Sequence, residues 1–195
     1  MAFPAFLDTN VLYGATLCDT MLRVAEHGAY RPHWSAAVLG ELVEALVRHA
    51  GIPLERAERR VAHMRRAFPH AAVEEYEVLV EAMACDPKDR HVLAAAVAAR
   101  CEVVVTFNVK DFPHESTHPH QISVVTPDAF LLDQLDLHEP MVRRALEAQV
   151  SQARRPQLTM GQLLASLARA GVPAFAEEVR RQELGDTSQA DDALS

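Results

Sequence analysis

The chain has 195 residues, of which 49% are hydrophobic and 24% are charged, and its formal net charge is −8. This length supports one well-packed domain with an appendage and excludes two large domains. The negative charge argues against a protein that coats nucleic acid, because an acidic surface repels a polyanion, and it favours a selective enzyme.

Apolar and β-branched runs alternate with helical patterns along the first two thirds of the chain. Five short strands are expected near residues 3–8, 31–34, 71–74, 103–106 and 122–125. Helices are expected from Thr9 or Asn10 through Val24, from Ala36 to about His49, after Pro53, and at residues 127–135. This alternation is typical of an α/β fold in which helices cover both faces of a central, mostly parallel sheet.

Carboxylates follow two of these strands. Asp8 closes the apolar run Ala5-Phe6-Leu7, and Asp111 comes shortly after the run Val103–Thr106. In open α/β sheets, ligands bind at the carboxyl ends of the strands. We therefore expect Asp8 and Asp111 to lie at one edge of the sheet.

Two further acids lie in helical patterns. Glu41 lies within the helix that Ser35 is expected to cap, and Asp89 precedes the alanine-rich run Val92–Ala99, near the start of its helix. Asp86 is the alternative acid in the same segment. Helix capping is the competing interpretation for both aspartates, because a carboxylate there also binds free backbone N–H groups.

Together these segments resemble the PIN-domain ribonucleases, and within them the VapC-type toxins of bacterial toxin–antitoxin pairs. Four segments carry the resemblance, in the family's order: Leu7–Leu12, Glu41-Leu42, Asp86–Ala96 and Thr106–Phe112. The resemblance extends from the start of the chain to about Asp136. It implies a three-layer α/β/α PIN-like domain at residues 1–136.

The resemblance also implies a metal-dependent endoribonuclease. The family's acidic positions, which would hold the ion, correspond to Asp8, Glu41, Asp89 and Asp111. Three polar residues would support them, namely Asn10, Thr106 and Asn108. Carboxylates suit Mg²⁺ or Mn²⁺, which promote phosphodiester hydrolysis. The implied partners are an RNA substrate, a small antitoxin whose tail occludes the acidic cleft, and a second copy of the chain in a homodimer.

The helix after Pro53 carries arginines on one side and apolar residues on the other. Its expected buried stripe consists of Leu54, Ala57, Val61, Met64 and Phe68. Candidates for contact with RNA phosphates are Arg59, Arg60 and Arg66. The alternative is a solvated face, balanced by Glu55 and Glu58.

The segment His114–His120 is the best candidate for a separate histidine metal site. Three of its residues are histidines. Pro119 and the absence of a helical i, i+4 frame favour an exposed loop instead.

The composition changes after Asp136. Residues 143–181 contain seven arginines and three glutamates, so this part is basic while the rest is acidic. A helical extension is expected at residues 137–184, with one helix from Glu139-Pro140 and a second one capped by Thr159. It would bind RNA, a partner or a second subunit, or it simply packs against the flank of the sheet. The polar tail at residues 185–195 is expected to be disordered.

Three cysteines, Cys18, Cys85 and Cys101, form neither an even disulfide framework nor a CxxC metal pair. This usage is typical of a reducing cytoplasm. The N-terminus lacks the basic region of a signal peptide, and no stretch approaches a membrane span. We therefore expect a cytoplasmic protein with no membrane partner.

Two other functional classes compete with the nuclease. A catalytically silent PIN-like scaffold would bind RNA or protein through its arginine-rich helices, but the presence of all four acids favours the enzyme. A phosphatase of the haloacid-dehalogenase type is set aside, because it would need an aspartate where the chain has Asn10.

Overall fold

The computed structural model of the chain describes residues 2–153 and 157–192, with side chains described up to residue 184. A five-stranded sheet forms the centre, in the order β3-β2-β1-β4-β5, and all neighbouring strands are parallel. The strands are β1 Phe3–Leu7, β2 Tyr30–Ser35, β3 Ala72–Val73, β4 Val103–Val105 and β5 Ser123–Val125. All five lie where the apolar runs predicted them.

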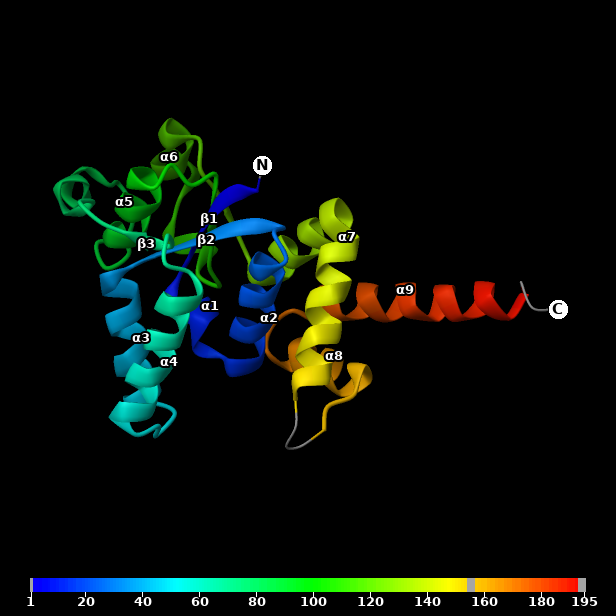
Figure 1. The fold of residues 1–195 in the computed structure, drawn as a ribbon. Coiled ribbons are helices and arrows are strands. Elements are labelled where there is room, and N and C mark those ends of the chain that lie inside the picture. The colour runs from blue at the N-terminus through cyan, green and yellow to red at the C-terminus, as the bar shows by residue number, and fades with distance from the viewer. Residues whose placement is uncertain (1, 154–156, 193–195) are drawn as a thin grey trace.

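Helices cover both faces of this sheet, which confirms the predicted three-layer α/β/α architecture (Figure 1). On one side lie α1 Thr9–Tyr13, α2 Ala15–Glu26, α3 Ala36–Arg48 and α4 Leu54–Ala67. On the other side lie α5 Arg90–Ala98 and α6 His114–Thr117. Short 3₁₀ helices connect the elements, namely η1 Glu77–Ala82, η2 Val109–Asp111 and η3 His118–His120.

The central strand β1 is covered on both faces. Its residues Ala5, Phe6 and Leu7 are all 0% exposed, as expected for the middle of a parallel sheet. The alanines at positions 94–96 of α5 are equally buried. Their small side chains let α5 approach β1, β2 and β4 closely.

The three cysteines are buried and none forms a disulfide, as predicted. In the described part of the chain, none of the helices has the length and apolar character needed to cross a membrane. The cytoplasmic location stays a prediction.

Three local predictions are wrong. The helix expected from residue 9 to 24 is interrupted at Gly14, which has extended backbone angles and poor helix propensity. The segment expected to be a loop at 114–120 forms α6 and η3. The backbone N–H of Ser116 closes a helical turn by donating to the Pro113 carbonyl at 2.8 Å, and the Ser116 hydroxyl donates to the same oxygen. Leu54 is 54% exposed, because it begins α4 beyond the reach of the core.

The C-terminal part forms α7 Pro127–Gln152, α8 Met160–Arg169 and α9 Pro173–Asp192. α7 consists of two helical segments joined by a kink at His138, close to Pro140, whose missing N–H interrupts the helical ladder. Thr159 begins α8 with a capping box, as its position in the sequence indicated. α9 continues to Asp192, past the expected helix end at residue 184, because a helix that has started extends at little cost. Residues 193–195 of the expected disordered tail lie outside the described residues.

This extension packs against α2 and against its own start. The Gln149 side chain accepts a hydrogen bond from the Thr20 hydroxyl at 2.7 Å and donates to the Thr16 carbonyl at 3.2 Å. The Asp128 carboxylate accepts hydrogen bonds from the backbone N–H groups of Ala174 and Phe175, in the first turn of α9. The described contacts therefore join the extension to the domain through buried polar groups, and its function stays open.

The turn between α8 and α9 touches the loop that follows β4. Gly171 in this turn has a φ of +96°, and a Cβ there would lie 2.7 Å from Cε1 of Phe107. The backbone N–H of Phe107 donates to Oδ1 of Asn10 at 3.1 Å. The C-terminal extension thus contacts the carboxyl-terminal edge of the sheet, where the acids were expected.

We expect Gly171→Ala to destabilise the chain by about 1–3 kcal/mol, because alanine is strained at positive φ and its methyl group collides with Phe107. Gly40→Ala is the matched control. Gly40 lies within α3 with nothing within 4 Å of its Cβ position, so alanine should stabilise the helix by roughly 0.5–1 kcal/mol. Urea unfolding measures both effects. Adding Phe107→Ala should recover part of the loss at Gly171, and a Gly171→Ala protein as stable as the native chain would contradict the close contact.

Candidate active site

A cleft of about 530 Å³ opens at the carboxyl-terminal edge of the sheet. After β1 the chain builds β2 and β3 on one side, and it then crosses over to build β4 and β5 on the other. The edge between β1 and β4 is therefore the topological switch point, where open α/β sheets bind ligands. The cleft is lined by Asp8, Thr9, Asn10, Tyr13, Glu41, Ala45, His49, Lys88, Asp89 and Asn108.

Asp8 follows β1 and is only 5% exposed. Its Oδ1 accepts the backbone N–H of Thr9 at 2.6 Å, and its Oδ2 accepts from Nδ2 of Asn10 and from the Thr106 hydroxyl, both at 2.7 Å. Burial raises the pKa of Asp8, although the bonds from Thr106 and Thr9 oppose this effect. The three donors fix the carboxylate in one orientation, and two of them are the side chains of Asn10 and Thr106, which the resemblance implied as supports.

Asn108, the third predicted support, acts on this network through its backbone. Its N–H donates to the Thr106 hydroxyl oxygen at 3.0 Å, and the residue itself lines the cleft.

Glu41 reaches the cleft from α3 and is held by two neighbours. Its Oε2 accepts from the Thr9 hydroxyl at 2.6 Å, and its Oε1 lies 3.0 Å from Nε2 of His91. The hydrogen bond with His91 lowers the pKa of Glu41, and the same bond raises the pKa of His91. The pair therefore favours an ionised carboxylate at this wall of the cleft.

Asp89 precedes α5, but its side chain makes no capping hydrogen bond. Its Oδ2 is buried and accepts no hydrogen bond from any described residue. Burial raises the pKa of Asp89 to about 6, helped by the charges of Asp8 and Asp111 and opposed by Lys88. Capping therefore does not explain this residue, which holds in the cleft a carboxylate oxygen that accepts no hydrogen bond from a described residue, although a buried charge needs one.

Lys88 lies between two of the acids. Its Nζ is 3.8 Å from Oδ2 of Asp89 and 3.4 Å from Oδ2 of Asp111. The hydrogen bond to Asp111 is the main reason why the pKa of Lys88 is raised. Asp111 does not line the cleft itself but is connected to it through this ammonium group. Lys88 thus acts as an internal counter-ion.

Asp86, the alternative to Asp89, has a local structural role. Its Oδ1 accepts the backbone N–H of Lys88 at 3.1 Å, and it does not line the cleft. Asp89 is therefore the acid of this segment that the structure brings beside Asp8 and Glu41.

The predicted four-acid metal site can be compared with this geometry. Among the side chains that the structure describes, at residues 2–153 and 157–184, no three His, Cys, Asp or Glu residues are arranged to hold a metal ion. Lys88 separates Asp89 from Asp111, and hydrogen bonds engage the other two acids. The side chains of the cleft still fit a divalent cation. Oδ2 of Asp89 accepts no hydrogen bond from a described residue, and a carboxylate oxygen is a hard ligand of the kind that such a cation prefers. The four-acid ligand set stays a prediction.

The arginines of α4 differ in their surroundings. Arg59 and Arg60 line a groove of about 730 Å³ between α2 and α4. The guanidinium of Arg60 donates to the carbonyl oxygens of Leu12 and Tyr13 at 2.5 and 3.1 Å, so it anchors α4 to the end of α1. Arg66 is exposed at the end of α4. Contact of these arginines with RNA stays a prediction.

Sequence reasoning missed Thr9, Lys88 and His91 as members of this site. All three stand inside segments that carry the resemblance, within two positions of residues that were selected. Their partners Glu41 and Asp111 come from distant parts of the chain, and the spacing of residues does not reveal such pairs.

Comparison with known proteins extends these observations. The family model described as "PIN domain" matches residues 4–110, and the one described as "VapC50 C-terminal domain" matches residues 127–181. A curated Mycobacterium tuberculosis protein named "Putative ribonuclease VapC50" is 46% identical over 106 residues. The match covers 54% of this chain and 62% of that protein. The match to the PIN-domain model includes Asp8, Glu41 and Asp89 and ends one residue before Asp111.

We expect Asp89→Asn to stabilise the chain at neutral pH in the absence of divalent ions. The folded protein keeps the Asp89 proton up to about pH 6, whereas the ordinary pKa is 3.8. Between these values the folded state binds more protons than the unfolded state, so its stability falls as the pH rises and the loss is complete above about pH 6. Asparagine removes this loss, which is worth roughly 1–3 kcal/mol.

Thermal unfolding across this pH range measures the effect. Asp86→Asn is the matched control, because Asp86 lies outside the cleft and asparagine can accept the same backbone hydrogen bond. An Asp89→Asn protein with the pH profile of the native chain would show that the Asp89 carboxylate is not destabilising.

Proposed function

The chain belongs to the PIN-domain family, and we propose that it is a metal-dependent endoribonuclease that hydrolyses the phosphodiester bonds of RNA. The observation that carries the proposal is the buried oxygen of Asp89, which accepts no hydrogen bond from a described residue, in a cleft shared with Asp8 and Glu41. A catalytically silent scaffold, the alternative function, gains nothing from a buried charge that lowers its stability. Active sites commonly keep such a charge because catalysis requires it.

The proposed cofactor is Mg²⁺ or Mn²⁺, held by Asp8 and Asp89 and completed by Glu41 and Asp111. A bound divalent ion supplies positive charge that stabilises the transition state of phosphodiester hydrolysis. The Lys88 side chain is 64% exposed. Once the metal ion neutralises Asp89 and Asp111, the ammonium group of Lys88 can pair with a phosphate of the RNA.

The protein's own residues preorganise this site. Asn10 and Thr106 hold the carboxylate of Asp8, and His91 keeps Glu41 ionised. The cleft therefore presents fixed negative charge before substrate arrives, and little reorganisation is needed during the reaction.

We further propose that the protein is the toxin of a toxin–antitoxin pair, that a small antitoxin occludes the acidic cleft, and that the chain forms a homodimer in the cytoplasm. Support comes from the match of residues 127–181 to the VapC50 C-terminal domain. Light scattering of the purified chain, with and without the product of a neighbouring reading frame, measures both assemblies. A monomer that binds no such product would contradict both.

We expect Asp89→Asn to reduce metal-dependent RNA cleavage by a factor on the order of 10² or more, because a ligating charge is lost. No hydrogen bond to a described residue is lost with it, since the Oδ2 atom accepts none. Cleavage of a labelled RNA in Mg²⁺ and in Mn²⁺ measures the effect. Asp86→Asn should cleave like the native chain, and the opposite ranking would make Asp86 the third acid.

We expect the α4 arginines to divide into two kinds. Arg59→Gln and Arg66→Gln should each flatten the plot of log RNA affinity against log salt by about 0.7, because one phosphate contact is lost. Arg60→Gln should chiefly lower the thermal stability, since it removes the bonds to Leu12 and Tyr13. Binding is measured in the Asp89→Asn background to prevent cleavage. Unchanged slopes in the first two variants would show that α4 is not in contact with RNA.

A further inference from the structure

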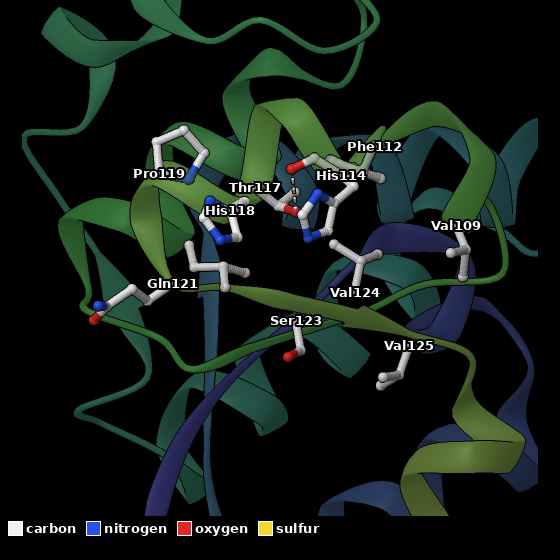
Figure 2. Close-up of a pocket in the computed structure, with 11 residues that line it drawn as sticks. Val109, Phe112, His114, Thr117, His118, Pro119, Gln121, Ser123, Val124 and Val125 are labelled. Carbon is white, nitrogen blue, oxygen red and sulfur yellow. Dashed lines mark hydrogen bonds between the residues drawn. The ribbon is translucent and has the colours of Figure 1, made fainter.

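A cavity of about 880 Å³ lies between α6, η3 and the edge strand β5, and it shares no lining residue with the acidic cleft (Figure 2). Two histidines line it, His114 at the start of α6 and His118 at the start of η3. Figure 2 shows their rings next to each other above β5. The ring centroids are 4.9 Å apart and the planes are inclined by 41°.

The helical turn gives these histidines a frame that a loop would lack. The segment from His114 to His118 has the order His-Glu-x-x-His, the spacing at which two imidazoles on one helical face bind Zn²⁺. The sequence alone favoured a loop here, and α6 followed directly by η3 now places the two rings on one side.

The separation of the rings agrees with binding to one ion. With a Zn–N distance of about 2.0–2.1 Å, an imidazole centroid lies about 3.2 Å from the metal. Two such rings at ligand angles of about 90–110° have centroids about 4.5–5.2 Å apart. The observed 4.9 Å falls within this range.

We propose that His114 and His118 form a binding site for Zn²⁺ or a neighbouring late first-row ion. Imidazole nitrogens suit these ions and do not suit Mg²⁺, so the site would be chemically distinct from the carboxylate cleft. In metalloproteases, the glutamate of the His-Glu-x-x-His motif acts as a general base. Here the corresponding residue, Glu115, does not line the cavity. The proposal is therefore limited to metal binding, and it does not depend on the nuclease proposal.

The bound ion would act as a clip on a short helix. α6 has four residues, fewer than a helix needs to be stable by itself. An ion that joins its first residue to the first residue of η3 favours the helical turn, and it stabilises the folded state by mass action. The segment His114–His118 begins three residues after Asp111, so a bound ion would also restrict the motion of the chain that follows Asp111.

Calorimetric titration of the full chain with Zn²⁺, in excess Mg²⁺ to engage the carboxylates, tests the site. We expect one Zn²⁺ to bind per native chain, and its affinity to fall by about tenfold or more in His114→Ala and in His118→Ala, because loss of a residue that only supports a ligand already costs about this much. His118→Phe should lose as much, because phenylalanine keeps the ring contact and removes the nitrogens. His120→Ala is the matched control, because His120 does not line the cavity.

Thermal unfolding provides the second readout. Zn²⁺ should raise the Tm of the native chain and of His120→Ala, and it should raise it far less in the other three variants. Both histidines are exposed, so the variants should fold without metal. Unchanged Zn²⁺ affinity in His114→Ala and His118→Ala, an equal loss in His120→Ala, or full binding by His118→Phe would each overturn the proposal.

Discussion

The burial of the Asp8 carboxylate at the end of β1 is the constraint on which the rest of the site depends. A charge that is 95% covered requires partners, and it receives them from Thr9, Asn10 and Thr106. These donors come from α1 and from the loop after β4, so satisfying one carboxylate fixes both segments at the switch point of the sheet. Asn10 extends the network further, because its side-chain oxygen accepts the N–H of Phe107, and the ring of Phe107 meets Gly171 of the C-terminal extension. The extension is thus connected to the carboxyl-terminal edge of the sheet by direct contacts.

The other acids of the cleft are balanced in different ways. Glu41 is hydrogen-bonded to His91, which lowers the pKa of Glu41 and keeps it ionised. Burial raises the pKa of Asp89 to about 6, and the ammonium group of Lys88, 3.8 Å away, opposes this shift only in part. Lys88 reduces the repulsion between the carboxylates of Asp89 and Asp111, but it does not form a hydrogen bond with Asp89. The negative charge that remains in the cleft favours the binding of a further cation. This arrangement costs stability, which is the usual consequence of keeping a functional charge in a partly buried place.

Sequence patterns predicted the sheet well because buried strands have short, continuous apolar runs. They also led to Asp8 and Asp111, since residues at strand ends share an edge in a parallel sheet, whereas Asn10 and Thr106 came from the resemblance to the PIN-domain family. They did not lead to Lys88 or His91, because the contacts of these residues depend on how separate loops fold back. The helical turn at His114 was missed because a helix of four residues is too short to show periodicity in the sequence. Pro119 did not help, because proline is as common in loops as at the start of a helix. Arg60 was grouped with the other arginines because charge alone does not distinguish a solvated side chain from one that anchors a helix.

The affinity of the cleft for Mn²⁺, measured by electron paramagnetic resonance, is the most direct test that the Asp89 carboxylate serves to bind a divalent ion. The comparison requires the native chain, Asp89→Asn and Lys88→Gln, all carrying His114→Ala so that the cavity under α6 does not contribute. We expect Asp89→Asn to weaken Mn²⁺ binding by about tenfold or more, and Lys88→Gln to strengthen it because the ammonium group no longer competes for the acids. Equal Mn²⁺ affinity in all three proteins would contradict a metal site in this cleft.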